Sequence, residues 1–223
     1  CGSMLDVCAR CRRVEFAKEL FHAMDAQRVE KDIIAYNSMV QVCGMCRQPR
    51  EALAYFEGIS PALWDQASPA NQQIAFQLVM TAFARVGDYG KTRDLFGQMV
   101  ARQIPPNNAH FNALLTACAD GPHAQLAQQV FDLMPQYRVE PNVVNWTILL
   151  TCHRHDLPRC LALVQELEAA GGKATGLTYQ ELLKAHVLAR DGPGARGLIR
   201  AKGGQWNSGR KLESLVRQAE ELP

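Results

Sequence analysis

The chain has 223 residues, of which 48% are hydrophobic and 7% aromatic, and its formal net charge is +2. A charge this close to neutral gives no general electrostatic case for binding nucleic acid, although helices can still segregate basic side chains onto one face. No run of 18 or more apolar residues occurs, so the sequence predicts no membrane-spanning helix. The eight cysteines lack the dense spacing of a secreted disulfide scaffold, which favours a reducing compartment.

Residues 1–32 begin with Cys1 rather than Met, and Cys1 falls in the middle of an expected helix. We therefore expect the natural chain to extend upstream, with any targeting leader outside this sequence. A second helix follows in this stretch, with apolar residues at helical spacing from Val14 to Met24.

Residues 33–207 continue as a series of helical pairs. The clearest pair is 108–142, whose first helix places Phe111 and Leu115 on one face and whose second helix ends before Pro135. The repeats that we infer are 1–32 (incomplete), 33–72, 73–107, 108–142, 143–175 and 176–207 (degenerate). Residues 208–223 then form a C-terminal capping helix, with Ser208 as its N-cap.

Three columns of residues establish the repeat. A small residue in the second helix recurs at spacings of 35, 40, 35, 33 and 35, in the order Ala17, Ala52, Thr92, Ala127, Cys160, Ala195. An aromatic residue early in the first helix recurs as Tyr36, Phe76, Phe111, Trp146 and Tyr179. A third column runs Met24, Ile59, Met99, Met134, Leu167. One helical pair cannot bury both of its apolar faces alone, so the pattern predicts an all-α fold, an α-solenoid of stacked helix-turn-helix repeats.

The irregular spacings fall in connections. The spacing of 40 reflects five extra residues after Ile59, which we interpret as an expanded connection over 60–71 containing Trp64. The spacing of 33 reflects two residues missing between Trp146 and Cys160. A tryptophan in a proline-flanked insertion is a candidate protein contact, so Trp64 is assigned to that role.

The motifs within the columns resemble those of pentatricopeptide repeats. They include Ala17-Lys-Glu-Leu-Phe-x-x-Met24, Ala127-Gln-Gln-Val-Phe-x-x-Met134 and Glu140-Pro-Asn-Val-Val-Asn-Trp146. Tetratricopeptide repeats require a glycine in the middle of the first helix, where this sequence has Val40, Met80, Leu115 and Leu183. The resemblance covers residues 1 to about 200 and implies an organellar solenoid whose first helices hold single-stranded RNA, one base per repeat.

The resemblance also implies which residues contact RNA. The fifth and last residues of each repeat would hydrogen-bond the base edge, which pairs Asn37 with Asn71 or Gln72, Gln77 with Asn107, Asn112 with Asn142, and Thr147 with Thr175, and adds Gln180. The second residue would wedge between bases, at Ile34, Ile74, Ala109, Val144 and Leu177. Arg10 and Arg85 share a position near the end of the first helix where family members contact phosphate.

Two clusters suggest other chemistry. Cys8, Cys11, Cys43 and Cys46 form two C-x-x-C pairs, but they lie 35 residues apart at equivalent repeat positions, so we interpret them as packing positions rather than a zinc site. His153, with Cys152 and Cys160 nearby, is likewise interpreted as packed or capping rather than as part of a nucleophilic site. No catalytic constellation is present, and we expect no metal and no cofactor.

The sequence therefore predicts a non-catalytic RNA-associated solenoid of an organelle, mitochondrial or alternatively chloroplastic, acting in RNA processing, stability or translation. A second hypothesis is a structural subunit of a large organellar ribonucleoprotein such as the mitochondrial ribosome, held by protein and folded-RNA contacts. A third is a peptide-binding helical scaffold. The expected partners are single-stranded or structured organellar RNA and other proteins of the assembly, with no small-molecule substrate.

Overall fold

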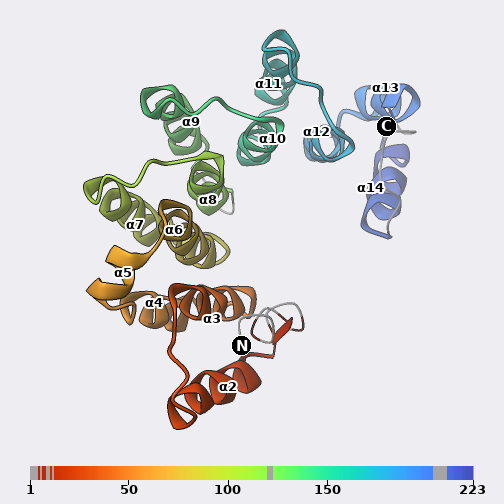
Figure 1. Cartoon of the computed structure of the whole chain (residues 1–223). Coiled ribbons are helices and arrows are strands. Elements are labelled where there is room, and N and C mark those ends of the chain that lie inside the picture. The colour runs from red at the N-terminus through yellow and green to blue at the C-terminus, as the bar shows by residue number, and fades with distance from the viewer. Residues whose placement is uncertain are drawn as a thin grey trace. The chain divides into compact units, whose positions relative to one another are not determined.

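The chain forms helices joined by short turns. A computed structural model describes residues 5, 7, 8, 11, 13–119, 123–202 and 210–222, and within these ranges there is no strand (Figure 1). Its elements are α2 Val14–Ala26, α3 Ile33–Met45, α4 Pro49–Glu57, α5 Pro61–Gln66, α6 Pro69–Ala84, α7 Tyr89–Ala101, α8 Asn108–Cys118, α9 Ala124–Leu133, the short 3-10 helix η1 Met134–Tyr137, α10 Val143–Cys152, α11 Leu157–Ala169, α12 Gly176–Leu188, α13 Gly192–Lys202 and α14 Arg210–Glu220. The expected all-α architecture is confirmed. None of the described helices is long and apolar enough to cross a membrane.

The chain divides into two compact units, Cys1–Cys118 (the N-terminal unit) and Ala119–Pro223 (the C-terminal unit). In the N-terminal unit α3 pairs with α4 and α6 with α7, while α3, α6 and α8 pack on one another in a row (Figure 1). Each of these first helices therefore meets several neighbours. Their long side chains are fully buried as a result, among them Met39, Phe76, Met80, Phe111 and Leu115.

The C-terminal unit repeats the arrangement. Helix α10 pairs with α11 and α12 with α13, and the first helices α10 and α12 pack together (Figure 1). Helix α14 lies against α12 and α13, where Ala219 is fully buried with Leu183 and Ala195. The buried side of α14 also includes the partly buried Leu215 and Val216. Its expected N-cap, Ser208, lies outside the described residues.

The repeat register is visible in how the second helices end. Arg28, Gln103 and Arg138 each adopt a left-handed backbone conformation, with φ of 54°, 59° and 58°. The next residue then donates its N–H back to the third-column residue, as in Val29 to Met24 and Ile104 to Met99. These three second helices therefore end with the same local backbone geometry.

The insertion differs from its expected structure. Residues 60–71 were predicted to be a connection, but they form α5 and the first turn of α6. The physical reason lies in two Ser-Pro pairs. Ser60 and Ser68 each accept a backbone N–H from three residues ahead, at 3.3 Å in both cases, and the following proline starts the helix with its fixed φ.

Candidate nucleic-acid interface

The first helices expose an aliphatic residue at the same register. Ile34 on α3 is 48% exposed and Ile74 on α6 is 41% exposed, while Val144 on α10 and Leu177 on α12 are 53% and 58% exposed. Ala109 on α8 is half-buried. Single exposed apolar residues are ordinary, but here they recur at one repeat position in each of the two units.

Helix α6 carries a polar stripe between two hollows. Gln77, Thr81 and Arg85 lie at successive turns of the helix and line both hollows. The first hollow, of about 260 Å³, adds Asn112 and Thr116 from α8. The second, of about 200 Å³, lies toward α3 and is completed there by residues that include Gln41 and Gly44. Amide, hydroxyl and guanidinium groups therefore converge beside the aliphatic row within one unit.

The sequence interpretation missed part of this stripe. Gln41, Thr81 and Thr116 each lie four residues after a predicted base-contacting residue, Asn37, Gln77 or Asn112 respectively. Residues four apart share a helix face, so they line the same surface one turn further along. The signal was present in the sequence as a polar residue at fixed spacing on an otherwise apolar helix.

Arg85 lies beside a third hollow of about 530 Å³, lined by Met45, Cys46 and Arg47. One guanidinium nitrogen of Arg85 lies 3.4 Å from the carbonyl oxygen of Gly44, so the side chain is held toward α3. Both arginines are exposed, and two guanidinium groups at one hollow suit a phosphate oxygen. Arg10, the other predicted phosphate contact, lies outside the described residues.

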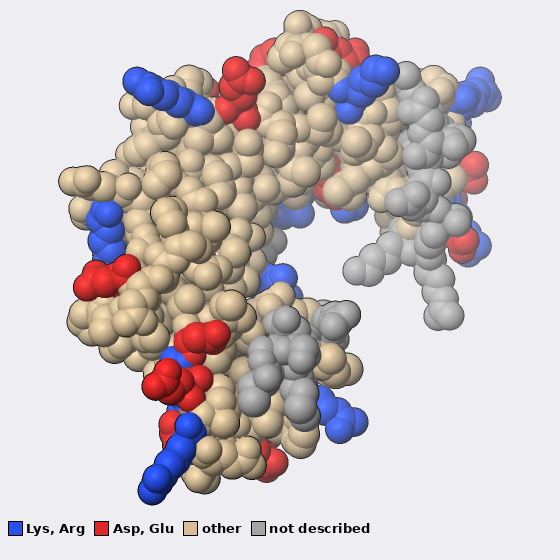
Figure 2. Space-filling model, in the orientation of Figure 1, with Lys and Arg blue, Asp and Glu red and all other residues tan. Residues whose placement is uncertain are grey.

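The basic side chains do not form a broad stripe on the face that Figure 2 shows. Among the described residues in that view, Lys and Arg appear singly, often beside Asp or Glu, with large uncharged areas between them (Figure 2). This distribution matches the net charge of +2. A net charge this small gives little long-range attraction for RNA, so individual contacts matter more than the overall charge.

Two of the predicted base-contacting residues are closed off from solvent. Asn37 is only 6% exposed, its Nδ2 lies 3.4 Å from the carbonyl oxygen of Asn71, and its Oδ1 is buried with no hydrogen-bond partner among the described residues. Thr147 is 5% exposed, and its hydroxyl lies 2.8 Å from both the Val143 carbonyl and the Thr178 hydroxyl. Gln77, Asn112 and Gln180 are instead half-buried, so part of each side chain reaches the surface.

The predicted last residues of the repeats cap the following first helices. Asn107 Oδ1 accepts the N–H of Ala109 at 2.9 Å, and Asn142 Oδ1 accepts that of Val144 at 3.0 Å. The Thr175 hydroxyl accepts more weakly, at 3.4 Å from its donor. These side chains satisfy helix N-termini whether or not RNA is present. Asn112 and Asn142 belong to different compact units.

The two residues predicted to pair with Asn37, which are Asn71 and Gln72, both make hydrogen bonds within the insertion. Asn71 lies within α6, and Gln72 Nε2 donates to the Trp64 carbonyl at 2.8 Å. The Trp64 ring itself is half-buried, with its centroid 5.6 Å from that of Phe56 and 5.8 Å from that of Phe76. Trp64 therefore contributes to packing at the same time as it offers part of its ring to the surface.

A buried histidine fixes the start of α8 against α6. His110 is 0% exposed; its Nδ1 accepts the N–H of Asn107 at 3.1 Å and its Nε2 lies 3.0 Å from the carbonyl oxygen of Gln73. This arrangement requires the neutral ring protonated on Nε2. Burial lowers the pKa of His110, which favours the same neutral form.

The buried cysteines pack in the core with unreactive thiols and His153 is half-buried, whereas Cys11 is exposed and does not take the packing position predicted for it. Cys8 and Cys43 are buried, and burial raises the pKa of the Cys43 thiol to about 12. Burial also raises the pKa of Cys160 to about 12, and its Sγ lies 3.1 Å from the His153 carbonyl. Because the thiolate is the reactive species, these groups are poor nucleophiles. Within the described ranges no group of three or more His, Cys, Asp or Glu could hold a metal ion.

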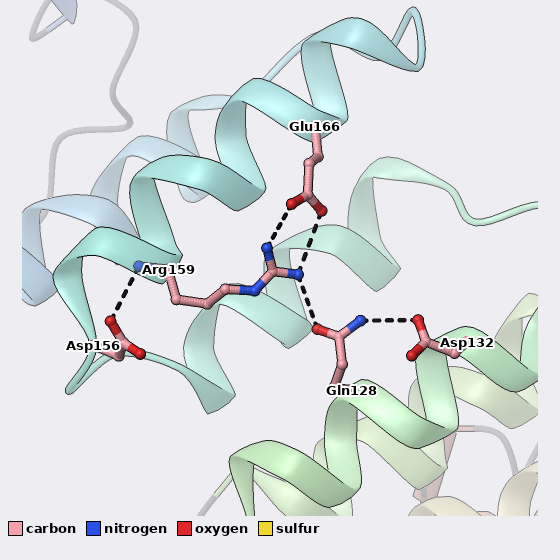
Figure 3. A network of polar contacts seen from close by, with 5 residues as sticks. All are labelled: Gln128, Asp132, Asp156, Arg159 and Glu166. Carbon is pink, nitrogen blue, oxygen red and sulfur yellow. Dashed lines mark hydrogen bonds and ion pairs between the residues drawn. The ribbon is translucent and has the colours of Figure 1, made fainter.

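On the second-helix side a polar network joins successive repeats (Figure 3). Arg159 on α11 contacts both carboxylate oxygens of Glu166 on the same helix and donates to Gln128 Oε1 on α9 at 3.0 Å. Lys18 on α2 and Glu51 on α4 form an ion pair of 2.7 Å at the equivalent positions of an earlier pair of repeats. Lys18 and Gln128 each come directly after the small residue of their second helix, and Glu51 and Arg159 each come directly before it. Polar bridges therefore supplement the apolar stack.

We expect Arg159→Ala to lower the free energy of unfolding by about 1 kcal/mol, because the pair with Glu166 is bidentate but partly solvent-exposed. Urea denaturation followed by circular dichroism measures the change. The control is Arg93→Ala, whose ion pair with Asp94 is 66% and 57% exposed and should contribute less than about 0.5 kcal/mol. Equal effects of the two variants would contradict the prediction.

Comparison with known proteins identifies the repeat. A sequence profile described as pentatricopeptide repeat domain matches residues 72–121 and 94–153, and one described as PPR repeat matches residues 1–29 and 34–59. Together they cover more than half of the chain. Two Arabidopsis thaliana pentatricopeptide repeat-containing proteins, one chloroplastic and one mitochondrial, are 24% and 22% identical, each over 149 residues, which are 66% and 67% of this chain and 25% and 24% of the relatives.

A further relative and a solved structure extend the comparison. The Arabidopsis thaliana small ribosomal subunit protein mS79 is 25% identical over 168 residues, 73% of this chain and 41% of that protein. The crystal structure of the pentatricopeptide repeat protein PPR10 in complex with an 18-nt psaJ RNA element has a TM-score of 0.80 at 18% identity, covering 98% of this chain and 30% of the other. This similarity confirms the α-solenoid fold. The chain spans less than half the length of each of these relatives.

Proposed function

This chain belongs to the pentatricopeptide repeat family, and from that membership we propose that it is a non-catalytic, RNA-associated protein of an organelle. Its relatives include one chloroplastic and one mitochondrial protein, which supports an organellar location, and of the two organelles we propose mitochondria, with chloroplasts as the alternative. Its role would lie in RNA processing, stability or translation.

The observation that carries this proposal is the polar stripe of α6. Gln77, Thr81 and Arg85 line hollows on both sides of the helix, next to the exposed aliphatic side chain of Ile74 on the same helix. An amide can donate to and accept from a base edge, an aliphatic side chain can lie against a base face, and a guanidinium can hold a phosphate. The stripe thus offers each type of contact that a single-stranded nucleotide needs.

The same surface supports binding rather than chemistry. Among the described residues that line the three hollows there is no Asp, Glu or His that could act as a general base. The buried thiols of Cys43 and Cys118 have pKa values raised by burial to about 12 and about 11. The proposal therefore assigns no step of bond breaking to the chain.

A second candidate function is that of a structural subunit in an organellar ribonucleoprotein. Asn37 and Thr147 are buried and engaged inside the protein, which leaves fewer open base-contacting residues than the repeat count implies. Each pair of base-contacting residues discriminates between bases by about 1–3 kcal/mol, so a small number of such pairs gives limited selectivity for RNA sequence. The similarity to the ribosomal protein mS79 favours the same reading.

Binding of single-stranded RNA pools at several salt concentrations tests the first proposal. We expect Arg85→Ala to weaken binding about three- to tenfold and to reduce the slope of log affinity against log salt by about 0.7, the value for one phosphate contact on a single strand. Arg93→Ala on the second helix α7 is the matched control and should leave affinity unchanged. An equal loss in both variants would show that only net charge matters.

Selectivity then separates the two candidates. If the chain reads RNA, Gln77→Ala should relax the preference at one base without a general loss of affinity. If the chain is mainly a scaffold, binding should be unselective with a shallow salt slope, and the protein should sediment with ribosomal subunits in organellar extracts. RNA affinity below that of an unrelated helical protein would rule out the first candidate.

A further inference from the structure

The five-residue insertion builds a pocket that a regular repeat would lack. The pocket encloses about 620 Å³ and is formed where the ends of α4 and α7 meet α5 and α6. Phe56, Ile59 and Ile104 are 4%, 4% and 6% exposed and form its apolar floor, and Trp64 forms one wall. We call this site the insertion pocket. Its volume lies in the range of pockets that hold a ligand or the side chains of a partner.

Aromatic contacts hold the wall of the insertion pocket in place. The Phe56 ring lies edge-on to both Trp64 and Phe76, with centroids 5.6 Å and 4.9 Å apart. The guanidinium carbon of Arg102 lies 5.0 Å from the Trp64 centroid, so its charge is directed onto the ring face. The Gln72 side chain also donates a hydrogen bond to the backbone carbonyl of Trp64. The wall is therefore preorganised, which lowers the entropic cost of binding.

The rim of the insertion pocket has a net negative character. Glu57 at the end of α4 and Asp65 on α5 are both exposed and line the opening. Within the part of the chain that the structure describes, neither forms an ion pair, whereas the single lining cation, Arg102, is stacked on Trp64. Two carboxylates against one guanidinium leave the lining with a net charge of −1, which attracts basic side chains and disfavours the phosphates of RNA.

We propose that the insertion pocket is a docking site for a protein partner that inserts one aliphatic side chain flanked by Lys or Arg. A half-buried Trp and an exposed Arg beside buried apolar side chains are residue types that recur at protein interfaces. The charge at the rim selects the flanking residues, and the floor selects the apolar one. The inference rests on the proposed function only in that a ribonucleoprotein assembly supplies such a partner.

Titration of the full chain with defined peptides tests the proposal. The probe is acetyl-Ala-Lys-Leu-Arg-Ala-amide, and the comparison peptides replace both basic residues by Glu or replace Leu by Gly. Methyl-labelled isoleucine places reporters at Ile59 and Ile104 on the floor. We expect the basic probe at millimolar concentration to shift both methyl signals, and each comparison peptide to bind more weakly.

The rim is tested with charge-neutral variants. The double variant Glu57→Gln/Asp65→Asn should raise the dissociation constant of the basic peptide about fivefold, as expected for loss of two exposed ion pairs. Glu140→Gln/Glu168→Gln makes the same change in net charge at exposed positions of the C-terminal unit and should have no effect. Absence of methyl shifts, or equal binding of the acidic peptide, would overturn the proposal.

RNA provides the remaining control. If oligouridylate shifts the signals of Ile59 and Ile104, the insertion pocket is a nucleic-acid site and the proposal is wrong. Failure here is distinct from failure of the proposed function, because Arg85→Ala should weaken RNA binding and leave peptide binding unchanged. The double variant Glu57→Gln/Asp65→Asn should weaken peptide binding and leave RNA binding unchanged.

Discussion

Replacing Phe76 with alanine should lower the free energy of unfolding of the N-terminal unit by about 3–5 kcal/mol, the usual cost of deleting a buried aromatic ring. Phe76 is 0% exposed and its ring centroid lies 4.9 Å from that of Phe56. It also lies 5.7 Å from the Arg102 guanidinium. Because α6 packs against α3, α4, α7 and α8, the cavity would open at the centre of the stack.

Urea denaturation and amide hydrogen exchange measure this effect. In a linear repeat protein each element depends mainly on its neighbours, so exchange should rise across α3 to α8 and stay nearly unchanged in α10 to α13. Phe16→Ala on α2 is the control, because Phe16 is 49% exposed and should cost less than about 1 kcal/mol. A uniform rise in exchange along the chain would contradict the expected locality.

Replacing His110 with leucine should cost roughly 2–5 kcal/mol at neutral pH. The change removes the hydrogen bond of His110 to the Gln73 carbonyl, worth about 1 kcal/mol, and leaves the half-buried Asn107 N–H without its acceptor at a cost of about 1–3 kcal/mol. His155→Leu is the control, because His155 is exposed. The comparison is made by urea denaturation at pH 7.5. A cost below about 1 kcal/mol would show that water replaces the histidine.

His110 also predicts a loss of stability in acid. Burial lowers the pKa of His110 in the folded state, so the unfolded chain takes up the proton first. Its contribution is complete above the ordinary histidine pKa of about 6.5 and falls as the pH drops through the folded value, by at most about 1.4 kcal/mol per pH unit. His153, whose pKa burial also lowers, acts in the same direction in the C-terminal unit. The difference between the unfolding free energies at pH 7.5 and at pH 5.5 should therefore be smaller for His110→Leu than for the unchanged chain.

Residue spacing predicted the parts of the fold that depend on local periodicity. The columns of Ala17, Phe76 and Met134 correspond to second-helix, first-helix and helix-end positions, and all three residues are buried as expected. Helical periodicity reports which face is apolar, and a constant period reports that each face has an equivalent neighbour. The insertion was mispredicted because its two Ser-Pro caps lie in a stretch without such periodicity.

The sequence indicates which repeat positions lie along the candidate interface, but it does not indicate which of their side chains are exposed to solvent. Ile34 and Leu177 are exposed at the position that the family resemblance assigns to them. Asn37 and Thr147 share one register with Gln77, yet only Gln77 reaches the hollows. Thr147 is closed off by a hydroxyl of the next first helix, Thr178, 31 residues away. No local pattern contains that contact.

By itself the sequence determined the helical repeat, its family and the row of first-helix positions, because these follow from covalent spacing and from which residues must avoid water. Tertiary structure decided which of those positions stay open, that Trp64 forms a pocket wall, and that His110 joins α6 to α8. Such outcomes depend on distances between helices far apart in the chain, where a hydroxyl, a ring or a carbonyl from one repeat either satisfies a polar group of the next or leaves it facing solvent.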